Sequence, residues 1–432
     1  MKKILFSLLF THSLYAIDFK IASYNVENLF DFSYSGYEYQ EYIPHKHNWT
    51  KKNFNKKLLN TAEVICDINA DIIGLQEVEN KNVLTLLQKK LRSMGCYYRY
   101  SSITHKSKSA IQVALLSKYP IQVSKEIIVH RKRGYRNILE VKFILDKHPF
   151  FVYINHWKSK ASPESYRMLS ARVLKNRLKS LPKGSEYILL GDFNSDYDEY
   201  LHLKKKHNDR AGKTGINHIL NTINARRIFN RKDNLEKYAF SHYNLWLELA
   251  NYKRWSHNFY GDKQALDSIL LPFTLLDGKG IDYKDNSFQV FKKSYLFHKK
   301  GYIFRWEYKK RKHQGRGYSD HLPIVATFST TKGFKKRDTS FRKISINELF
   351  NKTIQLPILL KEVKVISRKK RKVAIRQKGS SDSIFIYGIK SLLKLGRVYD
   401  IVVYKRKFYN GVYEIIDFEI EKSYDTNHTN KD

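Results

Sequence analysis

Acidic, amide and imidazole side chains stand at the ends of several short apolar segments in the first three quarters of the chain. Glu77 ends the segment IIGLQE, and His156 ends FVYINH. Such segments are typical of β-strands, and strands that end at one rim bring their terminal side chains together. We therefore expect one shared cleft, formed by Asn25, Glu77, His156, Asp192, Asn194, Asp267, Asp320 and His321.

Carboxylate and amide oxygens without a thiolate favour a hard divalent cation, with Mg²⁺ first, Mn²⁺ as an alternative and Ca²⁺ as an assisting ion. Glu77 and Asp320 could hold this ion, and Asp192 could orient or deprotonate a water. His156 and His321 could contact phosphoryl oxygens or donate a proton, so a phosphodiester is the fitting substrate. Taken singly, each residue also has an ordinary explanation as a turn or helix cap, and only their combined order favours chemistry.

The segments that must position these groups alternate between strand-like and helix-like patterns from residue 17 to about residue 330. Amphipathic helices are expected at 57–69, 83–94 and 165–181. This alternation predicts that residues 17–330 form one domain, an α/β sandwich. Its expected strands cover 20–24, 72–75, 113–116, 139–144, 151–154, 187–190, 269–271 and 324–328.

A second, smaller domain is expected after a basic linker at 331–345. Residues 346–422 contain five strand-like segments, which predicts an OB-like β-barrel, and 423–432 form a polar tail. The segment 361–378 carries nine Lys and Arg residues and one acid. This basic stripe suits a nucleic-acid backbone, but a charge run is also often only a solvated strand face. The candidate contacts are Lys369, Lys370, Arg371 and Lys372.

The overall charge indicates a polyanionic partner. The 432 residues include 80 Lys and Arg against 41 Asp and Glu, a formal net charge of +39, although part of this excess could reflect a Lys-rich proteome. DNA is the first candidate, RNA is a further one, and no protein partner is indicated. With 42% hydrophobic residues, a collagen-like or disordered polymer is excluded. Cys66 and Cys96 exclude a cysteine-based zinc cluster, and they leave open both a single bridge and a pair of buried free thiols.

The N-terminus has the pattern of a secretory signal peptide. Lys2 and Lys3 precede the apolar stretch 4–10, and Ala16 offers a small residue for cleavage. We expect a secreted or periplasmic protein whose mature chain starts near residue 17. No stable membrane insertion is expected, because no other segment is long and apolar enough to span a bilayer.

Six motifs resemble those of the endonuclease/exonuclease/phosphatase superfamily, particularly its secreted bacterial deoxyribonucleases. They are SYNVENL (23–29), LQEV (75–78), NHWKSK (155–160), GDFN (191–194), LDSIL (266–270) and SDHLP (319–323). The superfamily also includes abasic-site endonucleases, inositol phosphatases and bacterial sphingomyelinases. The resemblance covers about residues 17–328 and implies a four-layered αββα sandwich with a divalent-metal cleft. It implies that the metal ligands are Glu77, Asn25 and Asp320.

The same resemblance assigns roles to the remaining cleft residues. It implies that Asp192 and Asn194 handle the attacking water and the phosphate. Asp267 would orient His321, and His321 would act with His156 on the transition state. Phosphate-binding cations are also implied, with a solvated helix start as the alternative for the last of them: Arg136, Lys158, Lys160 and Arg167.

Two positions depart from the pattern of pancreatic-type enzymes. Those enzymes pair the histidine with an acid on the preceding strand, but residues 99–125 of this chain contain no Asp or Glu, which puts the acid role of His156 in doubt. They also carry a minor-groove arginine where this chain has Glu79. DNA binding would therefore lean on the positive field and on the barrel.

Three functions are compatible with these patterns. The first is a secreted, metal-dependent nuclease that hydrolyses DNA with little sequence specificity. The second is a secreted phospholipid phosphodiesterase, which would need an exposed aromatic hairpin, with 30–49 and 295–306 as its candidate segments. The third is a DNA-binding protein without catalysis. Intact carboxylates and histidines favour an enzyme, because binding alone does not require acids that face a phosphate.

Overall fold

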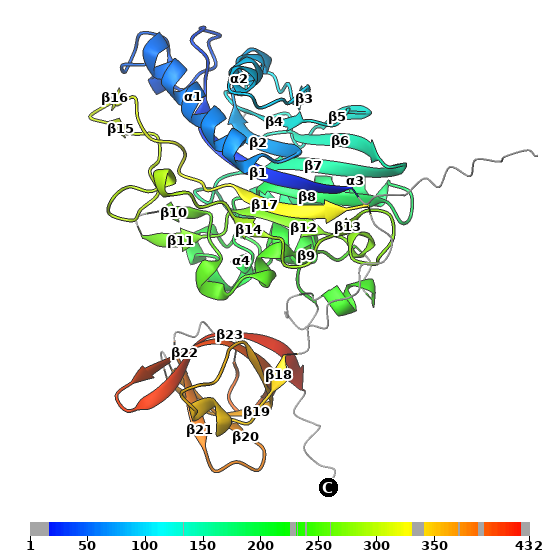
Figure 1. The fold of residues 1–432 in the computed structure, drawn as a ribbon, viewed down its shortest axis with the longest axis vertical. Coiled ribbons are helices and arrows are strands. Elements are labelled where there is room, and N and C mark those ends of the chain that lie inside the picture. Colours follow the sequence, from blue (N-terminus) through cyan, green and yellow to red (C-terminus); the bar gives the residue numbers. More distant parts are fainter. Residues whose placement is uncertain are drawn as a thin grey trace, which may run out of the picture.

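The computed structural model describes residues 17–424 apart from 133, 225–229, 231, 238–239, 260, 331–340, 370–371 and 388–392 (Figure 1). The expected signal peptide, most of the expected linker, and the tail from 425 onward lie outside the described residues. Among the described residues, no helix is both long and apolar enough to cross a bilayer.

Two mixed sheets form the first domain, and every strand expected there is present. The first sheet has the order β13-β17-β1-β2-β4-β3, with β14 also paired to β17. Its strands are β1 (Asp18–Leu29), β2 (Ile72–Val78), β3 (Tyr100–Ile103), β4 (Gln112–Ser117), β13 (Asp282–Tyr283), β14 (Gln289–Val290) and β17 (Ile324–Ser329). The second sheet has the order β5-β6-β7-β8-β12-β9. Its strands are β5 (Val123–Ile127), β6 (Ile138–Leu145), β7 (His148–His156), β8 (Glu186–Asp192), β9 (Tyr243–Asn244) and β12 (Asp267–Leu271).

Three hydrophobic cores show that the domain has four layers. One core lies between the sheets and combines, for example, Ile21 and Ile72 of the first sheet with Ile154 and Leu190 of the second. A second core packs α1 (Lys51–Ile68) and α2 (Lys81–Ser93) on the outer face of the first sheet. A third packs α3 (Glu164–Lys179) on the outer face of the second. The predicted αββα sandwich is therefore confirmed.

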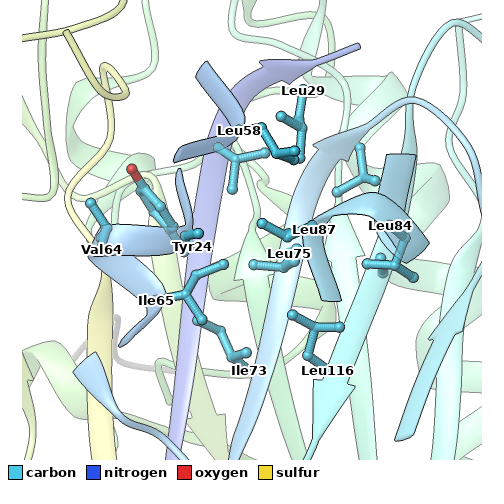
Figure 2. Close-up of a cluster of buried hydrophobic side chains, with 14 of the residues drawn as sticks. Tyr24, Leu29, Leu58, Val64, Ile65, Ile73, Leu75, Leu84, Leu87 and Leu116 are labelled. Atoms are coloured by element: carbon cyan, nitrogen blue, oxygen red, sulfur yellow. The ribbon is translucent and has the colours of Figure 1, made fainter. Parts of the chain in front are cut away.

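The outer core of the first sheet follows from alternating side chains on its strands. In Figure 2, Tyr24 of β1, Ile73 and Leu75 of β2 and Leu116 of β4 meet leucines and isoleucines of the two helices. Because side chains of a strand alternate between its faces, their neighbours point to the other side of the sheet. The expected cleft lies on that inner side of the sheet.

The two cysteines form a disulfide. Cys66, in the last turn of α1, is bonded to Cys96, which follows α2, and their Cα atoms are 5.7 Å apart. Of the two states that the sequence left open, the structure has the bridge. It links the two helices that cover the first sheet.

The C-terminal domain is a closed five-stranded barrel, as expected. Its strands run β19-β20-β21-β23-β22, and β22 pairs back with β19 to close the barrel. Among the five barrel strands as described, β21 and β23 form the one parallel pair, which matches an OB-like arrangement. The short β18 (Arg342–Lys343), within the expected linker, adds to this sheet parallel to β19. The barrel strands are β19 (Ile358–Lys369), β20 (Lys372–Gln377), β21 (Ser383–Tyr387), β22 (Val398–Tyr409) and β23 (Val412–Tyr424).

Candidate active site

Three candidate residues lie side by side at one end of the second sheet. The register of β7, β8 and β12 places His156 opposite Asp192, and Asp192 opposite Asp267. Each lies two positions along its strand from a residue of the core between the sheets, so all three side chains point to the inner face. The sheet register therefore assembles an imidazole and two carboxylates that are far apart in the sequence.

A glycine makes this close arrangement of strands feasible. Gly191, directly before Asp192, has φ of 135°, which L-residues with a side chain rarely adopt. A Cβ atom there would lie 2.0 Å from the carbonyl oxygen of Asn155. Only glycine fits at this point of β8.

Glu77 reaches the cleft because its backbone leaves the strand pattern. Strict alternation along β2 would turn this side chain toward the helices, but Glu77 has φ of 67° and the pairing of β2 with β4 is irregular at this point. Its carboxylate accepts hydrogen bonds from the side-chain amide of Asn25, at 3.1 Å, and from the backbone N–H of Asn28, at 3.0 Å. Burial, reinforced by the charge of Asp320, raises the pKa of Glu77.

Asn25 contacts two carboxylates of the cleft. Its side-chain oxygen accepts a hydrogen bond from the backbone N–H of Glu27, at 3.0 Å. Its nitrogen therefore faces the acids, and it donates to Glu77 and to Asp192, each at 3.1 Å. In this orientation Asn25 holds the two carboxylates in place, and its expected role as a metal ligand, which needs the amide oxygen, stays a prediction.

His156 lies between the same two carboxylates. Its Nε2 is 3.7 Å from Glu77 Oε1 and 3.6 Å from Asp192 Oδ2, too far for good hydrogen bonds. Its buried Nδ1 has no hydrogen-bond partner among the described residues. This agrees with the missing acid on the preceding strand. Burial, with the nearby charges of Arg136 and His321, lowers the pKa of His156 well below its usual value, so its imidazole is neutral at pH 7.

Asp192 has the environment of a general base. Its Oδ1 accepts the backbone N–H of Asn194 at 2.8 Å, and its Oδ2 accepts the side-chain amides of Asn25 and Asn194 at 3.1 Å. Asn194 is itself fixed by donation to the carbonyl of Trp157. Burial raises the pKa of Asp192 to about 7, since the charge of Asp267 adds to it and that of His321 only partly opposes it. A carboxylate with such a pKa can take a proton near neutrality.

Asp267 and His321 form the expected carboxylate–imidazole pair. His321 Nδ1 donates to Asp267 Oδ2 at 2.8 Å, and Ser256 Oγ donates to the same oxygen at 2.6 Å. Burial alone would lower the pKa of His321, but Asp267, Asp192 and Asp320 together raise it well above its usual value. His321 is therefore protonated at neutral pH and can act as an acid.

Asp320 has two close neighbours that sequence reasoning missed. Arg305 Nη2 lies 3.2 Å from Asp320 Oδ2, and His257 Nε2 lies 3.9 Å from the same atom. Although burial acts in the opposite direction, His321 and Arg305 hold the pKa of Asp320 below its usual value. Neither Arg305 nor His257 belongs to one of the six motifs, and only the sequence position of Arg305 close to Asp320 hinted at contact.

The cleft formed by these groups has a volume of about 860 Å³. Six of the eight candidate residues line it directly, and the other two, Asn25 and Asp267, stand behind and hydrogen-bond to residues that do. The six are Glu77, His156, Asp192, Asn194, Asp320 and His321.

The donor set of this cleft fits a divalent cation. Burial and mutual repulsion raise the pKa values of Glu77 and Asp192, which means that negative charge is held here without full compensation. Asp320 adds a third carboxylate and no cysteine is near. Hard oxygen ligands in this number suit Mg²⁺, and a cation would offset the repulsion. His257, Asp320 and His321 also place nitrogen and carboxylate atoms within 4.8 Å of one another, and His321 could bind an ion only after it loses its proton.

The four expected phosphate-binding cations divide into two pairs. Arg136, Lys160 and Arg167 border the cleft, whereas Lys158 is not one of the lining residues. Burial and the charge of Arg136 both lower the pKa of Lys158. Lys160 instead forms ion pairs with Asp196 and Glu199, at 2.8 and 2.6 Å. Arg167 is wholly buried, and it binds Glu164 and the carbonyl oxygen of Ser159. Although Arg167 borders the cleft, its side chain is only 1% exposed and its guanidinium is engaged by these partners, so it shapes the loop before α3.

Two of the four basic barrel residues expected to contact DNA belong to the described part of the chain. Lys369 is exposed at the end of β19, whereas Lys372 is paired with Glu414 at 2.6 Å. Lys370 and Arg371 lie outside the described residues. Along β19, Lys361 and Lys364 are exposed while Val363 and Val365 fill the core, so the basic stripe faces outward.

The chain folds as a four-layered sandwich with acids and imidazoles at one end of its sheets, and this combination indicates its protein family. The model described as Endonuclease/Exonuclease/phosphatase family matches residues 20–330, and the chain belongs to that family. Members of this family are phosphodiesterases and hydrolases that generally depend on a divalent metal. No curated protein sequence matches the chain significantly.

Solved structures with a similar fold have low sequence identity to this chain. TDP2 from D. rerio complexed with single-strand DNA product is 15% identical, with a TM-score of 0.45, over 72% of this chain and 98% of that one. A family protein from Bacteroides thetaiotaomicron is 13% identical, with a TM-score of 0.47, over 73% and 99%. One from Leptotrichia buccalis is 16% identical, with a TM-score of 0.43, over 71% and 98%.

Proposed function

We propose that the protein is an exported, metal-dependent nuclease that hydrolyses phosphodiester bonds of DNA with little sequence specificity. The main observation behind this proposal is that Asp192 and His321 line the same cleft. The raised pKa of Asp192 suits a general base, and the raised pKa of His321 suits a general acid. Two titratable groups shifted toward opposite tasks are the usual arrangement for hydrolysis at neutral pH. The net charge of +39 favours a polyanionic substrate.

The chain's own residues supply each step of the reaction. Asp192 orients a water and takes its proton as the water oxygen bonds to phosphorus. The phosphorus–oxygen bond to the leaving strand then breaks, and His321, held by Asp267, gives its proton to the leaving oxygen. Arg136 and Lys158 bind the non-bridging oxygens. Glu77 and Asp320 would hold a divalent cation such as Mg²⁺, which would supply charge neutralisation.

The phospholipid alternative has less support. Its candidate membrane segments contain Trp49 and Trp306, which are 0% and 2% exposed, so these large aromatic rings pack inside the protein. Within the described residues, the exposed large side chains of these two segments are tyrosines such as Tyr34 and Tyr302. Membrane insertion requires a cluster of exposed aromatic or aliphatic side chains.

Export is proposed on the pattern of residues 1–16 and is supported by the disulfide. Bridges such as Cys66–Cys96 persist mainly in oxidising compartments. N-terminal sequencing of protein recovered from the periplasm and the medium should give a start near Ile17. Uncleaved protein confined to the cytoplasm would contradict export.

The function is tested on purified protein with plasmid, single-stranded DNA, RNA and sphingomyelin, each with Mg²⁺ and with EDTA. We expect DNA hydrolysis that is lost with EDTA and with Asp192→Ala, but kept with Asp382→Ala, which removes an exposed acid of the barrel. Hydrolysis of sphingomyelin alone would establish the lipid alternative. DNA that is bound but not cut by the wild-type protein would establish the non-catalytic one.

A further inference from the structure

A short hairpin next to the cleft carries four consecutive cations. Strands β15 (Tyr308–Lys309) and β16 (Lys312–His313) pair with each other, and Lys310 and Arg311 form the two-residue turn between them. All four basic side chains, 309–312, are exposed. Lys309 has an ion-pair partner in Glu307, whereas within the described part of the chain no ion pair engages the three that follow.

The turn of this hairpin uses residues that its backbone does not favour. Lys310 and Arg311 have φ of 50° and 58°, and turns with two such residues normally contain Asn-Gly. A lysine and an arginine in this conformation cost stability, because their Cβ atoms crowd the backbone. The Asp146–Lys147 turn between β6 and β7 has φ values of 48° and 68°, so this backbone alone does not mark a function. The feature that sets 309–312 apart is the row of four exposed cations at one tip.

The hairpin is held firmly despite its exposed tip. His313 is fully buried, accepts a hydrogen bond from the indole of Trp306 at 3.0 Å and donates to the carbonyl of Glu41 at 2.8 Å. The side chain of Asn48 donates to the carbonyl of His313 at 2.7 Å. A rigid base lowers the entropy that the tip would lose on binding a partner.

The base of the hairpin is continuous with the cleft wall. Arg305 lines the cleft and contacts Asp320, and Lys310 follows it by five residues. Five residues of extended chain span at most about 17 Å. Phosphates of one DNA strand follow each other every 3.4 Å along the axis, so the tip lies within about five base pairs of Arg305 at the cleft wall.

We propose that the hairpin 308–313 binds the phosphate backbone of duplex DNA beside the cleft and thereby holds the substrate across the site. This inference rests on the proposed function for the identity of the substrate. The cations at the tip make it a partner for phosphate rather than for hydrocarbon, and Tyr308 is the one large aromatic side chain of the hairpin. The hairpin contributes to DNA binding and not to the chemical step.

The test removes the two turn charges with Lys310→Asn/Arg311→Asn, since asparagine tolerates the left-handed backbone. The matched control is Lys147→Asn/Lys183→Asn, which removes two exposed charges. Lys147 also has a positive φ, and the two lysines precede β7 and β8, whose opposite ends carry His156 and Asp192. Binding of a 30-base-pair duplex is measured by fluorescence anisotropy in EDTA, so that it does not depend on hydrolysis.

We expect the hairpin variant to lose at least about tenfold in affinity at 0.1 M salt, and the slope of log affinity against log salt to fall by about 1.8. In Mg²⁺ its KM for DNA should rise while kcat stays within twofold, and the control should resemble wild type. An equal loss of DNA affinity in the control would overturn the proposal, because it would show that the overall positive charge of the protein binds DNA. A fall in kcat would overturn a pure binding role.

The experiment distinguishes a failure of this inference from a failure of the proposed function. If the wild-type protein binds duplex DNA but does not cut it, the enzyme assignment fails while the hairpin is still judged by its binding loss. The last measurement is binding of the wild-type protein and the hairpin variant to vesicles of phosphatidylglycerol. If the hairpin variant loses vesicle binding but binds DNA as wild type does, the partner is an anionic lipid surface and the proposal is wrong.

Discussion

Asp267 Oδ2 accepts a hydrogen bond of 2.8 Å from Nδ1 of His321, although the two residues are 54 positions apart and lie on segments of different sheets. Asp267 begins β12 of the second sheet, and His321 lies just before β17 of the first. The bond fixes which imidazole nitrogen carries a proton toward Asp267 and leaves Nε2 for the substrate. It therefore joins the two halves of the sandwich at the point where the proposed chemistry occurs.

Replacing this carboxylate should affect chemistry more than binding. For Asp267→Asn we expect kcat to fall by about 10²- to 10⁴-fold with little change in KM, because an amide cannot stabilise a protonated imidazole. Plasmid cleavage under saturating DNA measures this effect. The control Asp382→Asn changes an exposed acid of the barrel and should keep its activity. Wild-type kcat in Asp267→Asn would show that His321 does not depend on its partner.

Arg167 should contribute to stability, not to DNA binding. Arg167→Met leaves Glu164 as an unpaired buried charge, so we expect a loss of about 3 to 5 kcal/mol in the free energy of unfolding, measured in urea. Arg172→Met, at an exposed position of the same helix, should cost less than about 0.5 kcal/mol. Glu164→Gln/Arg167→Met should recover most of the loss. A stable Arg167→Met variant with weaker DNA affinity would instead support the phosphate-binding role that the sequence resemblance implied for Arg167.

The disulfide should add measurable stability. The bridge closes a loop with a sequence separation of 30, for which loss of chain entropy in the unfolded state predicts about 3 to 4 kcal/mol. Cys66→Ser/Cys96→Ser should lower the urea midpoint accordingly, and wild-type protein in dithiothreitol should match it. An unchanged midpoint of the wild-type protein on reduction would argue against the bridge.

Glu186, at the end of β8 opposite to Asp192, predicts a pH effect on stability. Burial, with repulsion from Asp277 and Asp282, raises the pKa of Glu186 to about 7. The folded state then binds a proton that the unfolded state releases, so stability falls as the pH rises from about 4.5 to 7. Glu186→Gln keeps the group neutral and should gain on the order of 2 kcal/mol at pH 8 relative to pH 5. Thermal unfolding at both pH values measures this gain.

Glu236→Gln, which changes an exposed glutamate, serves as the control for that comparison. It should follow the wild-type dependence on pH. A Glu186→Gln variant that loses stability between pH 5 and 8 as steeply as the wild-type protein would place the titrating group elsewhere.

Many features of this protein could be predicted from local sequence. The strands that end in His156 and Asp192 are apolar runs with a polar terminus, and the barrel strands alternate as Val363 and Val365 do between lysines. Such periodicity depends on neighbours in the chain, so it survives without knowledge of the fold. The order of the six motifs likewise predicted the sandwich and the pairing of Asp267 with His321.

Other features depended on contacts that no local pattern contains. The left-handed backbone of Glu77, the orientation of Asn25 and the burial of Arg167 each follow from partners supplied by another strand or loop. The same holds for the disulfide, which requires α1 and α2 to lie side by side. The sequence by itself determined which elements form and which chemical groups end them, because alternation and apolar burial act over a few residues. Only the tertiary structure decided which of those groups face the cleft and which are consumed by ion pairs, because sheet register and long-range packing fix the distances between charges.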